Sequence, residues 1–301
     1  MFNKDYYNEI KNELINNEIY KKVKDYSKNR SDLNTYYNVG KLLSEAGKHY
    51  GEGIIKRYSE KLCTELGTKY NERTLRRYRQ FYNFFKDEKW SQSATKLSWS
   101  HYIELLPLKD SNIINYYISI CKSQNISRDE LRKRIKSKEY ERLDDKTKNK
   151  LIKKEETNVS DFIKNPIVIK NKNNVNIDEL SEKALKELIL ENIEDFMHEL
   201  GDGFTYVGNE YKIRIGDRYH YIDLLLFNYI YNSFIVIELK VTELKASYIG
   251  QIQEYVNYID KNIKLDMQNK TIGVIIVRKN NKFVMEYRTD NRILAKEYIL
   301  S

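Results

Sequence analysis

Two short stretches of the sequence place charged side chains inside otherwise apolar strands, where those side chains could do chemistry. Asp223 lies in Tyr-Ile-Asp-Leu-Leu-Leu-Phe, and Glu238 and Lys240 lie in Phe-Ile-Val-Ile-Glu-Leu-Lys. An ionised group in such a setting is costly unless it is paired with an opposite charge or bound to a metal. The stretch from His220 to Lys240 is therefore the candidate reactive part of the chain.

Strand periodicity predicts that these three side chains converge. Side chains alternate between the two faces of a strand, so Glu238 and Lys240 share one face. If residues 219–227 and 234–241 pair as an antiparallel hairpin, the start of the first strand lies beside the end of the second. That pairing brings Asp223 next to Glu238 and Lys240.

Two neighbouring carboxylates repel each other, and a divalent cation relieves that repulsion. Oxygen ligands from Asp223, Glu238 and a backbone carbonyl suit Mg²⁺ or Mn²⁺. Such a cation polarises a phosphate and lowers the pKa of a water molecule, and Lys240 can position that water or stabilise the phosphate charge. The same residues also fit a structural ion pair between Asp223 and Lys240, and the spacing alone leaves both interpretations open.

A helix is predicted over residues 246–260, and Gln251 and Tyr255 lie four positions apart within it. Residues four apart share one face of a helix. Gln251 could therefore reach the lysine or a phosphate. Ordinary helix surface and core positions are the alternative interpretation of this pair.

The first half of the chain is predicted to be all-helical, with Gly67 ending the third helix. His101 is a lone histidine for which a packed or surface role is more common than catalysis. The predicted helices cover residues 1–30, 32–46, 54–66, 71–85, 110–123 and 127–142.

The predicted helix over residues 71–85 carries a basic stripe at i, i+3, i+4 and i+7 spacing, formed by Arg73, Arg76, Arg77 and Gln80. An arginine stripe beside an apolar stripe is typical of a helix that docks on DNA, because guanidinium groups bind phosphates and guanine edges. A solvated charged face is the competing interpretation.

The second half changes to an α/β pattern after a Lys-, Asn- and Asp-rich segment, residues 146–176, which is predicted to be a linker. One amphipathic helix is expected over residues 181–200, and Gly216-Asp217 is a predicted tight turn. This order of elements indicates an α/β domain with a mixed sheet. The expected strands are residues 204–207, 210–215, 219–227, 234–241, 271–277 and 282–288.

The composition narrows the class of partner. The formal net charge is +9 and the isoelectric point is 9.1, which favours an anionic partner, nucleic acid first. A chain rich in Lys, Asn, Ile and Tyr can also reflect AT-rich codons, so diffuse lysine is weak evidence. We expect no membrane span, because no apolar run is long enough. The two isolated cysteines indicate a reducing cytoplasm, without a disulfide framework or zinc site.

The motif itself resembles a known family. Asp223 followed fifteen residues later by Glu238-Leu-Lys240 is similar to the active-site pattern of the PD-(D/E)xK nuclease superfamily. Ile222 stands where many members have a proline, a departure that other members share. Gln251 and Tyr255 match the Gln-xxx-Tyr helix of several branches of that superfamily.

The resemblance extends over most of the chain. The sequence is similar to the bacterial YhcG-like two-domain proteins, in which a helical domain precedes a nuclease domain. The matching motifs are Phe196-x-x-Glu-Leu-Gly201-x-Gly-Phe-x-x-Val-Gly208, Tyr50-Gly-x-Gly, Asn71-Glu-Arg-x-Leu-Arg76-Arg77 and Leu97-Ser-Trp-Ser-His-Tyr.

The resemblance implies an α+β multidomain fold. Residues 1–145 would form an all-helical, DNA-binding domain, residues 146–176 a linker, and residues 177–301 a restriction-endonuclease-like α/β domain with a mixed central sheet. Superfamily members also tend to use a glutamate from the first helix of this domain. Glu191 is the predicted residue, with Glu182 and Glu187 as competitors.

The function implied is a nuclease that depends on Mg²⁺ or Mn²⁺ and hydrolyses DNA, including branched or recombination and repair intermediates. Asp223 and Glu238 would bind the metal, and Lys240, Gln251 and Glu191 would complete the catalytic set. A catalytically silent nucleic-acid-binding protein and an RNA-directed nuclease are the alternatives. A homodimer is expected because many such nucleases pair to cut two strands.

Overall fold

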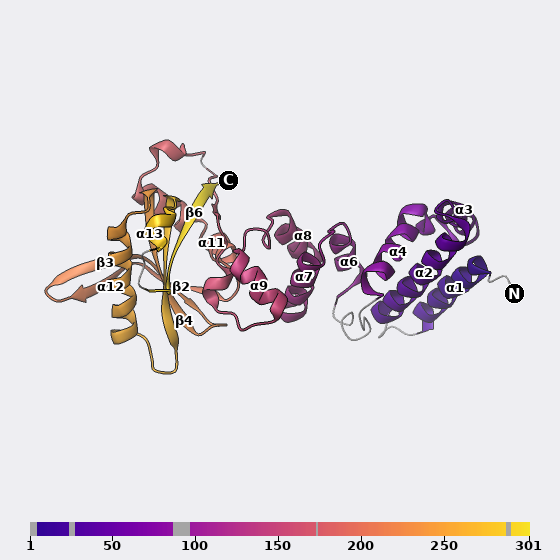
Figure 1. Ribbon diagram of the computed structural model, residues 1–301, viewed down its shortest axis with the longest axis horizontal. Helices are drawn as coiled ribbons and strands as arrows, with labels where there is room; N and C mark the ends of the chain where they lie inside the picture. The colour runs from indigo at the N-terminus through magenta and orange to yellow at the C-terminus, as the bar shows by residue number, and fades with distance from the viewer. Residues whose placement is uncertain (1–4, 24–27, 87–96, 173, 287–289) are drawn as a thin grey trace. The chain divides into compact units, whose positions relative to one another are not determined.

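The computed structural model describes residues 5–23, 28–86, 97–172, 174–286 and 290–301. The chain divides into two compact units, residues 1–137 and residues 138–301, which we call the helical unit and the sheet unit. Figure 1 colours the helical unit indigo to magenta, and the colour of the sheet unit ends in yellow. The predicted linker, residues 146–176, falls inside the sheet unit rather than between two domains.

The helical unit confirms the prediction of an all-helical first half over its described residues. Part of the predicted first helix and residues 87–96 lie outside them. The helices are α1 (Tyr6–Val23), α2 (Lys28–Tyr50), α3 (Ile54–Leu66), the short 3₁₀ helix η1 (Thr68–Tyr70), α4 (Glu72–Phe85), α6 (Trp99–Leu105), α7 (Ser111–Gln124) and α8 (Arg128–Lys136).

Helices α2 and α4 pack unusually closely because α2 presents a glycine to α4. A Cβ atom built on Gly40 would lie 2.1 Å from the carbonyl oxygen of Tyr78, far inside van der Waals contact. The ring of Tyr78 stacks on the ring of Tyr36, with centroids 4.3 Å apart. Gly40 therefore sets the spacing of the two helices, and aromatic stacking fills the space beside it.

His101 has a structural role. Its Nδ1 accepts a hydrogen bond from the backbone N–H of Ser98, in a capping box at the start of α6. Its Nε2 lies 3.0 Å from the carbonyl oxygen of Ile126. Both ring nitrogens are thus engaged in holding helix ends, which confirms the packed role expected from the sequence.

The sheet unit contains one six-stranded mixed sheet in the order β1-β6-β5-β4-β3-β2. Strands β1, β6, β5 and β4 run parallel to one another, while β3 is antiparallel to both β4 and β2. The predicted mixed sheet is confirmed. The strands are β1 (Ile167–Ile169), β2 (Phe204–Ile215), β3 (Arg218–Asn228), β4 (Ser233–Glu243), β5 (Asn269–Lys279) and β6 (Ile293–Leu300).

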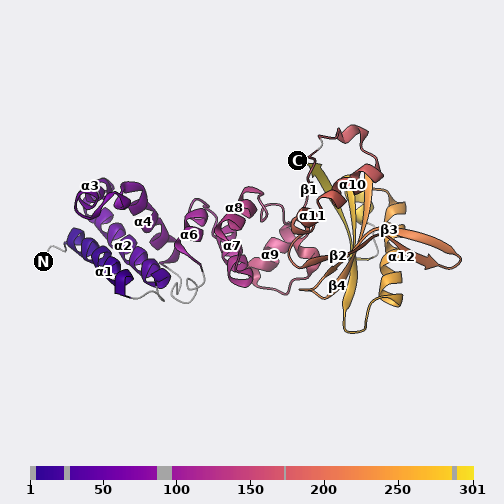
Figure 2. The same ribbon diagram turned by 180° about the vertical axis from the view of Figure 1, so that it is seen from behind.

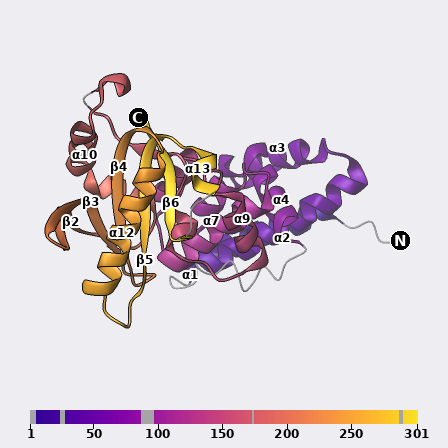
Figure 3. The ribbon, with the colours of Figure 1, turned by 60° about the vertical axis from the view of Figure 1, so that its left-hand side comes forward.

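Helices cover both faces of this sheet (Figures 2 and 3). Helices α10 (Glu182–Glu191) and α11 (Ile193–Leu200) bury one apolar layer on residues that include Leu224 and Ile237. Helix α12 (Ala246–Asn262) buries a second layer on the opposite face, which includes Val236. The remaining elements are α9 (Asp145–Lys153), η3 (Val159–Phe162), η4 (Ile177–Glu179) and α13 (Lys282–Glu286). Within the described ranges, no helix combines the length and apolar character that crossing a membrane requires.

Several predicted element boundaries were wrong. The linker segment contributes α9 and β1, because the three apolar residues 167–169 pair with β6. The two strands predicted over residues 204–215 are one strand with a bulge between Tyr206 and Gly208. Residues 282–286 form a helix instead of a strand, since the Asn281 side chain accepts hydrogen bonds from the first helical N–H groups. Strand β6 was not predicted.

The predicted single helix over residues 181–200 is interrupted at Asn192. This buried residue has φ −130° and ψ 40°, which is outside the helical region. Its side-chain amide donates to the carbonyl oxygen of Leu188, so the interruption is itself hydrogen-bonded. Helix α10 can therefore take a direction different from that of α11.

Candidate active site

Strands β3 and β4 separate at the position of the predicted charges. Their antiparallel ladder runs from Asn228–Ser233 to Leu224–Ile237, and beyond it β3 continues beside β2 while β4 continues beside β5. Asp223 and Glu238 are the first residues past the last pair. The predicted antiparallel arrangement is confirmed, and the opening between the strands leaves room for polar side chains inside the sheet.

The three predicted side chains meet at this opening. Oδ2 of Asp223 accepts a hydrogen bond of 2.9 Å from the backbone N–H of Leu239. Nζ of Lys240 lies 3.3 Å from Oε2 of Glu238. Glu238 is only 2% exposed and Lys240 8% exposed, so both charges are largely removed from water.

Glu238 carries an unsatisfied oxygen. Its Oε1 is buried and has no hydrogen-bond partner among the described residues. Burial, followed by the nearby charge of Asp223, raises the pKa of Glu238 to about 7. A buried carboxylate oxygen without a partner is the feature that a cation would satisfy. The two carboxylates thus fit a hard divalent cation.

The rest of a metal coordination sphere would have to come from other sources. Within the described part of the chain, no group of three or more His, Cys, Asp or Glu side chains is arranged to hold a metal ion. Mg²⁺ is commonly bound by only one or two carboxylates and completes its shell with water and phosphate oxygens. The absence of a third side-chain ligand is therefore compatible with a site at Asp223 and Glu238.

Helix α12 supplies the predicted glutamine. Nε2 of Gln251 lies 3.4 Å from Oε2 of Glu238 and donates a hydrogen bond of 2.9 Å to the hydroxyl of Tyr255. The two residues share a helix face, as their spacing predicted. Gln251 thus contacts the carboxylate of Glu238 rather than the lysine.

The helical glutamate at the site is Glu182, not the predicted Glu191. Oε2 of Glu182, in the first turn of α10, lies 3.4 Å from Nζ of Lys240. Glu191 is the last residue of α10 and is exposed. The Ser181 cap starts α10 beside β4, and Glu191 follows Glu182 by nine positions, which moves it about 13 Å along the helix.

A second lysine, Lys186, was not predicted from the sequence. Its Nζ lies 3.4 Å from Oδ1 of Asp223 and pairs with Glu210 on β2. It follows Glu182 by one helical turn, so the i, i+4 spacing could have identified it once Glu182 was placed. Burial opposes the charge of Lys186, but Glu210 and Asp223 outweigh that effect and raise its pKa.

The charges of this cluster do not balance. Four carboxylates, Glu182, Glu210, Asp223 and Glu238, surround two lysines. Burial opposes the charge of Lys240, yet Glu238, Glu182 and Asp223 together raise its pKa, so the ammonium stays protonated. Because negative charge is in excess, the cluster is suited to an additional cation.

The predicted basic stripe of α4 is only partly available to a ligand. Arg76 pairs with Glu72, and Gln80 donates to the carbonyl oxygen of Leu106. Arg73 is exposed and Arg77 half-buried, and neither has a hydrogen-bond or ion-pair partner within the residues that the structure describes.

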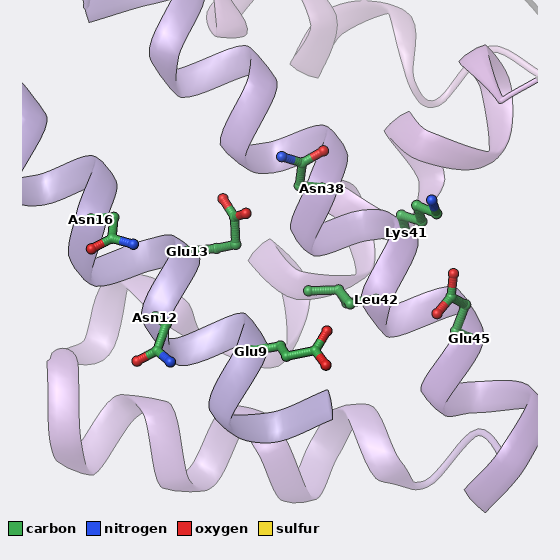
Figure 4. A pocket seen from close by; sticks show the side chains of 8 residues that line it. All are labelled: Glu9, Asn12, Glu13, Asn16, Asn38, Lys41, Leu42 and Glu45. Carbon is green, nitrogen blue, oxygen red and sulfur yellow. The ribbon is translucent and has the colours of Figure 1, made fainter. Parts of the chain in front are cut away.

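Positive charge is concentrated in the helical unit. Residues 1–137 contain 27 Lys and Arg against 17 Asp and Glu, whereas residues 138–301 contain 26 against 27. The excess is not uniform over that unit, because a shallow pocket between α1 and α2 is lined by Glu9, Glu13 and Glu45 (Figure 4). A nucleic acid would therefore bind to another face of the helical unit.

Each half of the chain matches the model of a known domain family. Residues 160–301 match the model of the YhcG PDDEXK nuclease domain, and residues 12–142 match the DUF1016 N-terminal domain. The YhcG protein of Escherichia coli (strain K12) is 27% identical over 307 aligned residues, which cover 88% of this chain and 82% of that protein.

Two solved structures are also similar to part of the chain. A repair endonuclease from Pyrococcus abyssi covers 40% of this chain, and EndoMS in a complex with double-stranded DNA covers 39%. Each is 20% identical with a TM-score of 0.31, and the match spans 47% and 44% of the solved chains. The chain therefore contains a DUF1016 N-terminal domain followed by a YhcG PDDEXK nuclease domain.

Proposed function

We propose that this protein is a metal-dependent phosphodiesterase that cleaves DNA, with its active site at Asp223, Glu238 and Lys240. The observation that carries the proposal is the buried, unpartnered Oε1 of Glu238, which lies beside a second carboxylate and a buried lysine. An ion pair alone would leave this oxygen unsatisfied. The nuclease family of the sheet unit supports the same reaction.

Each residue of the cluster would have a distinct task. Asp223 and Glu238 would hold Mg²⁺ or Mn²⁺, which when bound supplies positive charge to the phosphate and to the attacking water. Lys240, still protonated, would donate hydrogen bonds to that water or to a phosphate oxygen. Glu182 would position Lys240, and Gln251 would orient Glu238.

A nucleic acid is the class of substrate that the charge distribution favours. The sheet unit has almost no net charge, so attraction to a polyanion must come mainly from the helical unit. Arg73 and Arg77 on α4 would contact phosphates there. Cleavage in one unit and capture in the other would explain why the two are joined in one chain.

The test is a substrate panel with the full-length protein and Mg²⁺ or Mn²⁺, covering single-stranded, duplex and branched DNA and RNA of the same sequences. We expect metal-dependent cleavage of DNA that Asp223→Ala and Lys240→Ala lower by about 10²–10⁴-fold. Asp266→Ala, an exposed carboxylate, is the matched control and should keep full activity. Equal cleavage by the wild type and both site variants would reject the assignment.

The same panel decides between the remaining alternatives. A protein that binds DNA without cleaving it should show no heat of Mn²⁺ binding in calorimetry, whereas the proposed site predicts binding that Asp223→Asn abolishes. Faster cleavage of RNA would favour an RNA-directed nuclease, and faster cleavage of branched DNA would identify the proposed repair intermediates. Sedimentation of the active protein tests the proposed homodimer.

A further inference from the structure

The β2–β3 hairpin extends beyond the body of the sheet as a two-stranded arm. After β4 leaves at Asp223, β3 continues beside β2 to a two-residue turn at Gly216-Asp217, where Gly216 has φ 60°. Figures 1 and 2 show the end of this hairpin projecting past α12. The arm begins at the candidate active site, so a ligand bound along the arm would also reach the reactive residues.

One face of the arm belongs to the protein core. Ile213 and Ile222 are buried in the apolar layer that α12 covers. The ring of His220 contacts the ring of Tyr255 on α12, with centroids 6.0 Å apart. This face anchors the arm and fixes which side chains point the other way.

The opposite face of the arm carries two tyrosines and two basic residues. Lys212 is paired with Tyr221 across the strands, and Arg214 with Tyr219, so all four side chains share this face. The rings are exposed, at 56% for Tyr219 and 52% for Tyr221. Water-facing aromatic rings interleaved with cations suit a ligand that offers both flat apolar groups and negative charge.

The four side chains are continuous with the active site. Tyr219, Tyr221 and Asp223 alternate along β3, so they lie on one side of the strand. At the usual rise of a strand, Tyr221 and Tyr219 lie about 7 and 14 Å from Asp223. A chain of nucleotides running along this face would pass directly from the rings to the carboxylate.

The cations of the arm are available to phosphates. Nζ of Lys212 lies 3.9 Å from the ring centroid of Tyr219, and the guanidinium of Arg214 lies 5.9 Å from it. Arg214 also lies 3.7 Å from Asp217, in an exposed pair. Exposed ion pairs and exposed cation–π contacts are weak, so phosphate oxygens can replace them.

We propose that this face of the arm binds an unpaired DNA strand beside the scissile phosphodiester, with bases stacked on Tyr221 and Tyr219 and phosphates on Lys212 and Arg214. The proposal rests on the proposed function and names its substrate class, which is DNA with single-stranded segments. Bases within a duplex are already stacked on one another, whereas bases of a single strand present free faces to aromatic side chains. The arm would thus select unpaired nucleotides without reading their sequence.

The binding test uses the full-length protein in EDTA, so that it does not depend on cleavage. Oligonucleotides containing 2-aminopurine report stacking by a change in fluorescence, and anisotropy gives the affinity. We expect Tyr219→Ala and Tyr221→Ala each to weaken binding of single-stranded DNA at least about fivefold and to remove the fluorescence change. Binding of a blunt duplex should be unaffected.

Three matched variants distinguish the loss of base stacking from a loss of folding and from a loss of positive charge. Tyr219→Phe keeps the aromatic face and should restore both affinity and fluorescence. Tyr229→Ala removes another exposed tyrosine, 67% exposed and beyond the other end of β3, and should bind like the wild type. Lys212→Ala should lower the salt dependence of binding while leaving the fluorescence change in place.

The proposal is overturned if the alanine variants bind single strands as tightly as the wild type, or if they lose duplex binding equally. It is also overturned if sedimentation shows that the tyrosines instead hold two copies of the chain together. A wild type that binds single strands through the tyrosines but cleaves no DNA would reject the proposed nuclease function while supporting the arm.

Discussion

At the residue scale, the site is a set of charges held in place by one another. Lys240 lies between Glu238 and Glu182, while Lys186 lies between Asp223 and Glu210. Each lysine thus neutralises one carboxylate that would bind metal and one that would not. Because Lys186 competes with a cation for Asp223, it should tune how tightly the metal is held.

Replacing Lys186 tests this competition. We expect Lys186→Ala to bind Mn²⁺ about three- to tenfold more tightly, because a positive charge near Asp223 is removed. Cleavage should fall, since the same ammonium would no longer be available to the phosphate. Calorimetry and single-turnover rates measure the two effects. Lys183→Ala, an exposed lysine on the same helix, is the control and should change neither.

At the element scale, each unit is stabilised by its own contacts, which are close helix packing in the helical unit and a local ion cluster in the sheet unit. Gly40 allows α2 to approach the backbone of α4, and Arg292 joins the start of β6 to α12 through Asp260. Neither contact involves a residue of the candidate active site. They affect stability, and we expect their loss to leave the chemistry of the site intact.

The α2–α4 contact predicts opposite effects for two glycine substitutions. Gly40→Ala should destabilise the helical unit by about 1–3 kcal/mol, because its Cβ would overlap the Tyr78 carbonyl. Gly47→Ala, on the same helix, should be neutral or stabilising by up to about 1 kcal/mol, because its Cβ meets Arg79 at an ordinary 3.5 Å. Urea unfolding of both variants checks this, and equal effects would contradict it.

The Arg292 cluster predicts a pH dependence of stability. Hydrogen bonds from Arg292 lower the pKa of Asp290 to about 2. Because the folded pKa lies below the unfolded value, this contribution is present above about pH 4 and is lost as pH falls towards 2. It should amount to at most about 1 kcal/mol, given the partial exposure.

Asp290→Asn isolates this effect. The thermal unfolding temperature of the variant should lie below that of the wild type at pH 6, and the two should converge near pH 2. Asp266→Asn, an exposed carboxylate, provides the comparison and should follow the wild type throughout. A difference between Asp290→Asn and the wild type that persisted at pH 2 would show that the charge of Asp290 is not the cause.

At the scale of the whole molecule, the two units divide charge and chemistry between them. The helical unit carries all of the net positive charge, and the nearly neutral sheet unit carries the candidate active site. Long-range attraction to DNA therefore belongs to a different unit from the proposed hydrolysis. Substitutions on α4 should change DNA binding without changing metal binding at the candidate active site.

The arginines of α4 test that division. We expect Arg73→Glu with Arg77→Glu to weaken DNA binding and to reduce the slope of log affinity against log salt by about 0.9 for each phosphate that is no longer neutralised. Mn²⁺ binding should be unchanged. Arg128→Glu, an exposed arginine paired with Asp129, is the charge control with an expected smaller effect. If the α4 variant and the Arg128→Glu control bind DNA equally weakly, the effect comes from net charge in general and not from the α4 arginines.

Much of the site was predictable because it follows local rules. Alternation along a strand and antiparallel pairing brought Asp223, Glu238 and Lys240 together, and i, i+4 spacing paired Gln251 with Tyr255. Most helices of the first half were predicted for the same reason, because apolar periodicity and capping depend on residues that are close in sequence.

The tertiary structure decided what depends on distant partners. Strand β6 lies between β5 and β1, and β1 pairs only with β6 in the described sheet, across about 130 positions of sequence that no local pattern encodes. The packing of α10 against β4 placed Glu182 rather than Glu191 at the site and brought Lys186 to Asp223. The sequence by itself determined which strand residues carry the chemistry, while the fold alone determined which helix residues surround them.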